Sequence, residues 1–268
     1  MAAAVGALSV GALSGVDVLI GIDDTDDLVS PGTGRRARQL LQVLAKAGLG
    51  TPAGATRHQL LVDDRIPYTS HNSSACLAWR SPGGDPEAVL GAVIDAAAEF
   101  LENVCPPDAD PGLVVAVPGR LGAEAAALTE FGRRAQQEVL ATAAARRLAE
   151  EVGVHLSGHG GTEDGVLGAL AAVGLHLSGG DGFFLDLPGL ETLPAQADIA
   201  TVRSLTPIDV ARDNSHSSPT AGEPIELGDW VRPVLLNNQA VLLLEKPTVD
   251  HRGRRRWRTA ARSVVKTY

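Results

Sequence analysis

Cysteine, methionine, lysine and aromatic residues are all scarce in this 268-residue chain. The two cysteines, Cys76 and Cys105, stand alone, with no C-x-x-C pair and no Cys/His cluster, which excludes a zinc ribbon and a disulfide framework. We therefore expect a reducing, cytoplasmic setting. Aromatic residues make up only 3% of the chain, so the core must be built from Ala, Val, Leu and Ile.

A basic amino-terminal segment and a long apolar run are missing as well. The first 16 residues are small and apolar, but glycine and serine interrupt them and no basic residue precedes them. We therefore expect neither a signal peptide nor a membrane span. Residues 1–15 are predicted to form a disordered extension.

Positive charge is scarce except at the carboxyl-terminal end. The formal net charge is −9, which argues against a protein that mainly coats nucleic acid. From Arg252 to Tyr268, however, there are seven cations and no acid, so the rest of the chain carries −16. Residues 248–268 are predicted as a basic tail, which either contacts RNA from Arg252 to Arg262 or is simply solvated.

Hydrophobic periodicity in the first half predicts alternating strands and helices. Strands are predicted at residues 16–22, 56–62, 74–79 and 112–117, and helices at 34–47 and 86–102. The resulting order, β-α-β-β-α-β, is that of the ferredoxin-like arrangement. We therefore predict a ferredoxin-like domain over residues 16–118 that carries the acidic motif described below.

Beyond residue 118 the sequence is rich in alanine, glutamate and glycine. Residues 120–152 are predicted to form two helices divided at Gly132, and residues 166–173 a compact apolar helix. Short strands are predicted at 182–187, 231–236 and 240–244, and a surface loop at 213–223. Residues 119–247 thus form a second lobe, and the whole chain is predicted as an α+β protein in which a ferredoxin-like half packs with this lobe.

Four carboxylates fall within five residues directly after the first predicted strand, in the motif Asp23-Asp24-Thr25-Asp26-Asp27. Carboxylates this close repel one another, and a divalent cation relieves the repulsion. Oxygen ligands suit Mg²⁺ bound together with nucleotide phosphates. The alternative is a solvated turn that caps the following helix.

A glycine-dense loop at residues 158–165 leads into the apolar helix. Its backbone N–H groups and the positive end of the helix dipole would suit an anion. It lacks Gly-Lys-Ser/Thr, so it is not a Walker A loop. An ordinary connection with Thr162 or Asp164 as helix N-cap would explain the same residues.

A run of hydroxyl and amide side chains at residues 67–74 is a third candidate, either for hydrogen-bonding a polar ligand or as a plain loop. The candidate substrate-binding residues in it are Tyr68, Ser70, His71 and Asn72. Neither Ser-His-Asp nor Cys-His catalysis is supported by the order or spacing of residues.

The order of three motifs is more specific than any one of them. Ile20-Gly21-Ile22-Asp23-Asp24-Thr25-Asp26 precedes Arg65-Ile66-Pro67-Tyr68, which precedes the apolar stretch from Gly165 to Gly174. From about Asp17 to Leu236 the chain resembles the catalytic region of the archaeal tRNA-isoleucine agmatinylcytidine synthetase family. Those enzymes use ATP to activate a wobble cytidine, and agmatine then displaces the activating group.

The resemblance implies roles for individual residues. Asp23, Asp24 and Asp26 would hold Mg²⁺ and the ATP phosphates, and Asp23 and Asp24 would also be catalytic. Thr33 and Arg35 are further catalytic candidates, because Pro31-Gly32-Thr33-Gly34-Arg35 stands where the family has a Cys-Thr-Thr segment. The residues implied to face the nucleotide are Thr25, Gly158, Gly160, Gly161, Thr162 and Gly165.

Three departures from the family concern tRNA handling. Thr69-Ser70-His71-Asn72-Ser73 replaces Lys-Thr-Arg-Gly-Asn, and Thr162-Glu163-Asp164 replaces a basic pair. The stretch after Leu244 is too short for the family's oligonucleotide-binding fold and zinc ribbon. These differences favour a small molecule over tRNA as the acceptor.

The sequence therefore predicts a cytoplasmic, ATP- and Mg²⁺-dependent enzyme, ligase- or kinase-like, that activates a small-molecule acceptor by phosphoryl or nucleotidyl transfer. Two alternatives remain: a tRNA-modifying synthetase that acts on a cytidine, and a non-catalytic nucleotide-binding or scaffold protein. No membrane partner is expected, and formation of a homodimer is left open.

Overall fold

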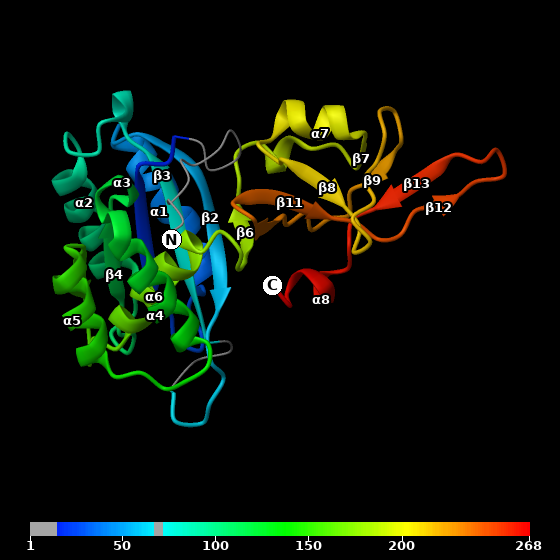
Figure 1. Ribbon diagram of the computed structural model, residues 1–268. Coiled ribbons are helices and arrows are strands. Elements are labelled where there is room, and N and C mark those ends of the chain that lie inside the picture. The colour runs from blue at the N-terminus through cyan, green and yellow to red at the C-terminus, as the bar shows by residue number, and fades with distance from the viewer. Residues whose placement is uncertain (1–14, 67–71) are drawn as a thin grey trace.

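The computed structural model describes residues 15–66 and 72–268 (Figure 1). The strands of its larger sheet are β1 (Val18–Asp23), β2 (Thr51–Gln59), β3 (Ser73–Arg80), β4 (Gly112–Ala116), β5 (His155–Gly158), β6 (Phe183–Asp186), β8 (Val210–Arg212), β10 (Val234–Leu236) and β11 (Gln239–Leu243). The helices are α1 (Thr33–Lys46), α2 (Leu90–Val104), α3 (Pro118–Leu121), α4 (Ala125–Ala135), α5 (Thr142–Val152), α6 (Gly165–Leu177), α7 (Ile199–Leu205) and α8 (Arg262–Val265). A smaller sheet contains β7 (Gln196–Ala197), β9 (Ile225–Glu226), β12 (Thr248–Val249) and β13 (Arg255–Arg258).

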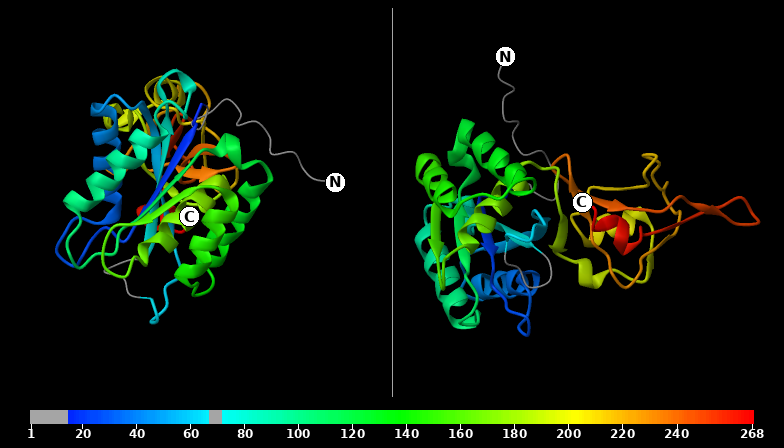
Figure 2. Two further views of the ribbon diagram at one scale, coloured as in Figure 1. Left: turned by 90° about the vertical axis from the view of Figure 1, so that its left-hand side faces the viewer. Right: turned by 90° about the horizontal axis from the view of Figure 1, so that it is seen from below.

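The larger sheet has the strand order β5-β4-β1-β3-β2-β6-β10-β11-β8. Its neighbouring strands are antiparallel except β11 and β8, which run parallel. Helices α4, α5 and α6 cover one face of its first part, and α1 and α2 cover the other (Figures 1 and 2). The predicted mixed α+β class is confirmed.

The first half follows the predicted chain order, β1-α1-β2-β3-α2-β4, and its strands lie in the order β4-β1-β3-β2. The sheet continues on both sides of this group, through β5 and through β6. Residues beyond 118 therefore complete the same sheet. The ferredoxin-like arrangement as a unit of its own, and the domain boundaries at 118 and 247, stay predictions. The predicted amino-terminal extension lies outside the described residues, except for its last residue, Gly15.

Helix α6 is the central helix of the molecule, and most of its residues on every side are buried. Its close approach to β1 depends on glycine: a Cβ on Gly21 would lie 2.1 Å from the carbonyl oxygen of Ala169. Small side chains at the contact let the helix and the strand pack backbone against backbone. This packing brings the amino-terminal end of α6 to the end of β1, where the acidic motif begins.

The structure corrects the predicted division of residues 120–152. Gly132 lies inside α4, where a Cβ would stand 2.9 Å from the carbonyl oxygen of Ala171 on α6. Glycine therefore serves helix packing at this position, and the break falls between Ala135 and Thr142 instead. Strand β5, which pairs with β4, lies between the predicted helix, which ended at residue 152, and the start of the predicted glycine loop, and no strand was predicted there.

The basic segment after residue 248 is folded and is not a tail. It forms the projecting β12–β13 pair and α8, with Trp257 and Val265 buried (Figure 1). Three of its arginines pair with carboxylates: Arg254 with Asp250, Arg255 with Glu223 and Arg258 with Glu226. Neither here nor elsewhere among the described residues is a helix long and apolar enough to cross a membrane.

Candidate active site

A cavity of about 190 Å³ opens at the end of β1. Its walls come from the segment after β1, the first residue of α1, the amino-terminal part of α6 and the connection between α4 and α5. Asp23, Asp24, Asp26 and Thr33 line it, as does Gly165. The tertiary structure thus joins the acidic motif and the start of the apolar helix in one site.

The carboxyl groups of Asp23 and Asp24 are partly buried beside other carboxylates. Burial, reinforced by the charge of Asp24, raises the pKa of Asp23 to about 8. Burial also raises the pKa of Asp24 to about 6, with further contributions from the charges of Asp110, Asp26 and Asp164. Shifts of this kind collect at functional sites. Asp24 also has φ of 50°, a strained backbone conformation of the kind found at functional sites.

Thr33 is held at the cavity wall by the acidic motif itself. Its hydroxyl donates to Asp26 Oδ1 at 3.0 Å, and its backbone N–H donates to the same oxygen at 3.1 Å. The buried Thr25 donates its hydroxyl to Thr33 Oγ1 at 3.1 Å. Thr25 is therefore a support for Thr33 and is not among the residues that line the cavity. Arg35 is exposed on α1 and does not line the cavity either.

Most of the glycine loop packs against the protein itself. A Cβ on Gly161 would lie 1.5 Å from Asp110 Oδ1, and one on Gly160 would lie 2.9 Å from the carbonyl oxygen of Ala109. Thr162 donates to Asp110 through both its backbone N–H and its hydroxyl. Close packing thus accounts for the glycines, and of the predicted nucleotide-facing residues in this loop, Gly158, Gly160, Gly161 and Thr162 are absent from the cavity lining, which includes Gly165.

The third candidate segment is only partly described. Tyr68, Ser70 and His71 lie outside the described residues. Asn72 lines the cavity, and its amide donates to the carbonyl oxygen of Leu61 at 2.7 Å. Ser73 of the same segment also lines the cavity, but of the four candidate substrate-binding residues only Asn72 can be placed at the site.

Several lining residues were missed by the sequence analysis. Glu138 comes from the connection between α4 and α5, Thr142 is the first residue of α5, and Asp164 precedes α6. Asp110 lies before β4, and its charge reaches Asp24. No local pattern marks Glu138 and Thr142, because only the packing of α4 and α5 on the sheet brings their connection to the cavity. Arg65, which also lines the cavity, belongs to the second of the three ordered motifs, but the sequence assigned it no role.

The acidic motif is suited to a Mg²⁺ ion that is bound together with a nucleotide. Among the described residues, no group of three or more histidine, cysteine, aspartate or glutamate side chains is arranged to hold a metal ion. Mg²⁺ is commonly bound by one or two carboxylates together with substrate phosphates and water. The donors present therefore fit an ion that arrives with a nucleotide better than one held by three aspartates at once.

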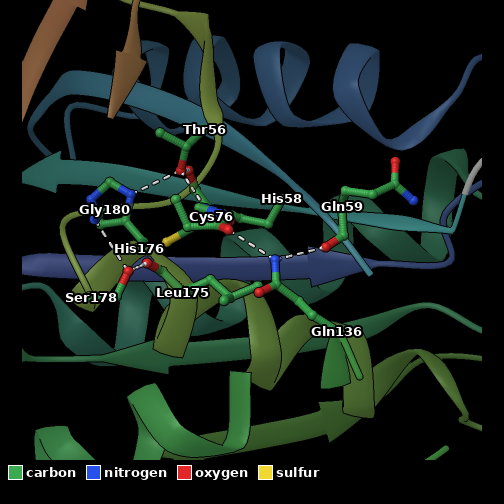
Figure 3. Close-up of polar contacts among 10 residues, drawn as sticks. Thr56, His58, Gln59, Cys76, Gln136, Leu175, His176, Ser178 and Gly180 are labelled. Atoms are coloured by element: carbon green, nitrogen blue, oxygen red, sulfur yellow. Dashed lines mark hydrogen bonds and ion pairs between the residues drawn. The ribbon is translucent and has the colours of Figure 1, made fainter. Parts of the chain in front are cut away.

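A second polar cluster joins β2, α4 and the end of α6, and its Thr56, His58 and His176 are buried (Figure 3). Thr56 Oγ1 lies 2.8 Å from His58 Nε2 and 2.8 Å from His176 Nδ1. His58 Nδ1 lies 2.7 Å from Asp181 Oδ1, and Gln136 donates to the other oxygen of Asp181. The arrangement has the partners of a Thr-His-Asp triad, but Thr56 and His58 are fully buried. We assign it a structural role that ties β2 to α4 and α6.

Comparisons with known proteins found similarity only among solved structures. No protein-family model matches the chain, and no curated protein matches its sequence. Solved structures do match. A tRNA fluorescent labeling enzyme is 27% identical with a TM-score of 0.50, and a complex of TiaS with an isoleucine tRNA and ATP is 26% identical with a TM-score of 0.50. Apo TiaS, described as a tRNA agmatidine synthetase, is 26% identical with a TM-score of 0.48.

These similarities concern one region of the chain. Each covers 59% of this chain. The chain has a region similar to the TiaS catalytic region, as the order of its motifs predicted. It spans only 35–36% of the length of those structures.

Proposed function

We propose that this protein is an ATP-dependent enzyme that modifies a cytidine of tRNA. The observation that carries the proposal is the meeting of Asp23, Asp24 and Thr33 with the start of α6 in one cavity, within a region similar to TiaS. One similar structure is a complex of TiaS with an isoleucine tRNA and ATP, and another is a tRNA labeling enzyme. Both descriptions name tRNA.

The small-molecule acceptor favoured by the sequence has no support in these comparisons. That prediction rested on lost basic residues near the motifs and on the short segment after Leu244. Arg65 supplies one cation at the cavity wall, although it is paired with Asp63. A tRNA acceptor is therefore the better-supported conclusion. The experiment below distinguishes release of ADP from release of AMP.

Different residues around the cavity would have different roles in the reaction. Asp23 and Asp24 would hold Mg²⁺, which would neutralise the nucleotide phosphates. The backbone N–H groups at the start of α6, beginning at Gly165, would donate to a phosphate oxygen. The hydroxyl of Thr33 is polarised by its hydrogen bond to Asp26. Thr33 is therefore the candidate acceptor if a phosphoryl group is transferred transiently to the protein. We infer that the group β4-β1-β3-β2 with α1 and α2 is a ferredoxin-like core carrying these residues.

The test uses the full chain with Mg²⁺, ATP labelled at the α- or γ-phosphate, an amine such as agmatine, and transcripts of an isoleucine tRNA with a wobble cytidine. The expected result is tRNA-dependent release of ADP or AMP and a mass change at one cytidine, measured by nucleoside mass spectrometry. A transcript in which uridine replaces the wobble cytidine should give neither.

Two variants make the test specific for the cavity. Asp24→Asn removes one carboxylate charge at the site and should reduce turnover at least a hundredfold. Asp95→Asn is the matched control, because Asp95 is exposed on α2 away from the cavity. Turnover that persists unchanged in Asp24→Asn, or ATP cleavage that tRNA does not stimulate, contradicts the proposal.

A further inference from the structure

A group of arginine and aromatic side chains joins β2 and β6 to the carboxyl-terminal part of the chain. Arg57 lies over the ring of Phe183, with its guanidinium 5.7 Å from the ring centre. Phe183 contacts Trp230 edge to face at 5.7 Å. The guanidinium groups of Arg232 and Arg262 lie 5.7 Å and 4.7 Å from the Trp230 ring. We call these five residues the arginine–tryptophan surface.

The positive charge of this surface is not neutralised within the protein. Across residues 15–66 and 72–268, no carboxylate lies within ion-pair distance of Arg57, Arg232 or Arg262. Arg57 donates to Gln59, and Arg232 donates to the backbone carbonyl of Val231. Burial lowers the pKa of the Arg57 and Arg232 guanidinium groups. Half-buried cations without a counter-charge are costly, and a bound anion offsets that cost.

The nearest acids do not remove this excess. Asp186 acts on Arg232 from a distance, but Arg38 and Arg262 add positive charge around the same guanidinium. In the β12–β13 hairpin, Arg254, Arg255 and Arg258 each have a carboxylate partner, whereas the exposed Arg252 and Arg256 form no ion pair with another described residue. The surface at Trp230 differs from the hairpin because none of its three arginines has a carboxylate partner among the described residues and each is packed on an aromatic ring. It includes Arg262, the last residue of the segment from Arg252 to Arg262 in which the sequence suggested an RNA contact.

The register of the sheet relates this surface to the candidate active site. Ile22 on β1 and Arg57 on β2 both pair with Ala75 on β3. Two strand spacings therefore separate them, which is about 10 Å. Asp23 follows Ile22 directly, and Leu60, just beyond the end of β2, lines the cavity. The arginine–tryptophan surface thus lies at the same end of the strands as the cavity, but on the sheet face covered by α1, whereas α6 and the connection between α4 and α5 wall the cavity on the other face.

We propose that the arginine–tryptophan surface binds the phosphate backbone of the tRNA whose cytidine enters the cavity. The partner rests on the proposed function. Arginine presents a planar fork of N–H donors that matches phosphate oxygens, and stacking on an aromatic ring fixes the fork before the ligand arrives. Because phosphate groups are the same at every nucleotide, the surface contributes affinity and register without reading the base sequence.

The experiment measures binding of the isoleucine tRNA transcript to the full chain by fluorescence anisotropy at several salt concentrations. The double variant Arg232→Gln/Arg262→Gln removes two cations and keeps the polar character of the side chains. It should bind tRNA roughly tenfold more weakly, and the slope of log K against log salt should fall by about two. The single variant Arg262→Gln should lower the slope by about one. Because Arg262 is exposed, this change should not disturb folding, so the test remains decisive if the double variant misfolds.

The matched control is Arg252→Gln/Arg256→Gln, which removes two exposed arginines from the β12–β13 hairpin. Its affinity and slope should equal those of the wild type. Nucleoside modification is measured in parallel, and in the Arg232/Arg262 variant KM for tRNA should rise while kcat is unchanged. If the wild type modifies tRNA but only the hairpin variant binds more weakly, the surface is wrongly placed and the proposed function stands. If the wild type neither binds nor modifies tRNA, both proposals fail.

Discussion

The carboxylate of Asp23 lies directly against the α-carbon of Gly168. A Cβ on Gly168 would stand 1.7 Å from Asp23 Oδ2 and 2.5 Å from its Cγ. The acidic motif at the end of β1 and the first turns of α6 are therefore one packed unit, although they lie far apart in the sequence. A change on either side of this contact must affect the other.

Replacing Gly168 by alanine should disrupt the site. The added methyl group overlaps the Asp23 carboxylate, so either α6 or Asp23 must move. We expect a loss of about 1–3 kcal/mol in the free energy of unfolding, as for other overpacked cores, together with weaker ATP binding. Urea denaturation and calorimetric titration with a non-hydrolysable ATP analogue measure the two effects.

Gly91→Ala is the matched control for that change. Gly91 lies in α2, and a methyl group added there would meet no atom within 4 Å, so alanine should stabilise the protein by about 0.5–1 kcal/mol through helix propensity. In an Asp23→Ala background, the cost of Gly168→Ala should shrink. An unchanged cost in that background contradicts the proposed clash.

Variants of Thr33 distinguish a structural role of its hydroxyl from a chemical role. Thr33→Val keeps the shape of the side chain but removes the hydroxyl that accepts from Thr25 and donates to Asp26. We expect a loss of about 1–2 kcal/mol in stability and loss of turnover, with Thr33→Ser restoring the turnover. Thr25→Val, which removes only the supporting donor, should lose stability and keep most of the turnover. Full activity in Thr33→Val would show that its hydroxyl serves structure alone.

Nucleotide binding should require a divalent cation. Without one, the raised pKa of Asp23 keeps that carboxyl largely protonated near neutral pH, while the ionised carboxylate of Asp24 faces the phosphates of ATP and repels them. Chelation with EDTA should therefore weaken binding of a non-hydrolysable ATP analogue by at least about tenfold, and added Mg²⁺ should restore it. Asp24→Asn, which removes one of the repelling charges, should show a smaller dependence on Mg²⁺. Equal affinity with and without the ion contradicts this account of the motif.

The buried histidine cluster should make stability depend on pH. Burial, with a further contribution from His58, lowers the pKa of His176 to about 3 from an ordinary value of 6.5. Between these values the unfolded chain binds a proton that the folded protein excludes, so the stabilisation is complete above pH 6.5 and is lost as the pH falls toward 3. The contribution of this group should fall by about 1.4 kcal/mol per pH unit within that window.

His176→Asn isolates this contribution. An asparagine amide can hydrogen-bond with the Thr56 hydroxyl in place of Nδ1, but it takes up no proton in this range. The variant should lose less stability than the wild type between about pH 6.5 and pH 5 in urea denaturation. His251→Asn, at an exposed position, should follow the wild-type curve. Parallel curves for His176→Asn and the wild type would mean that another group dominates this pH range.

The first half of the fold could be predicted from the sequence because its signals are local. The apolar run before Asp23, the spacing of Ala37, Leu40 and Leu44, and the positions of the turns were enough to order the strands and helices of residues 18–116. The later strands were harder to predict, because β7, β9 and β12 have only two residues each and exist through pairing with distant partners.

The sequence alone was enough to identify the acidic motif, the apolar helix and the likeness to the agmatinylcytidine synthetases, because each depends on residue types at short spacing. The tertiary structure alone decided which glycines border the cavity and which pack on Asp110. It also decided that Glu138 and Thr142 join the site, and that Arg262 of the basic segment meets Arg57 and Arg232 around Phe183 and Trp230. Such outcomes depend on which surfaces meet when strands and helices pack, and no local pattern encodes a contact between segments that are distant in the sequence.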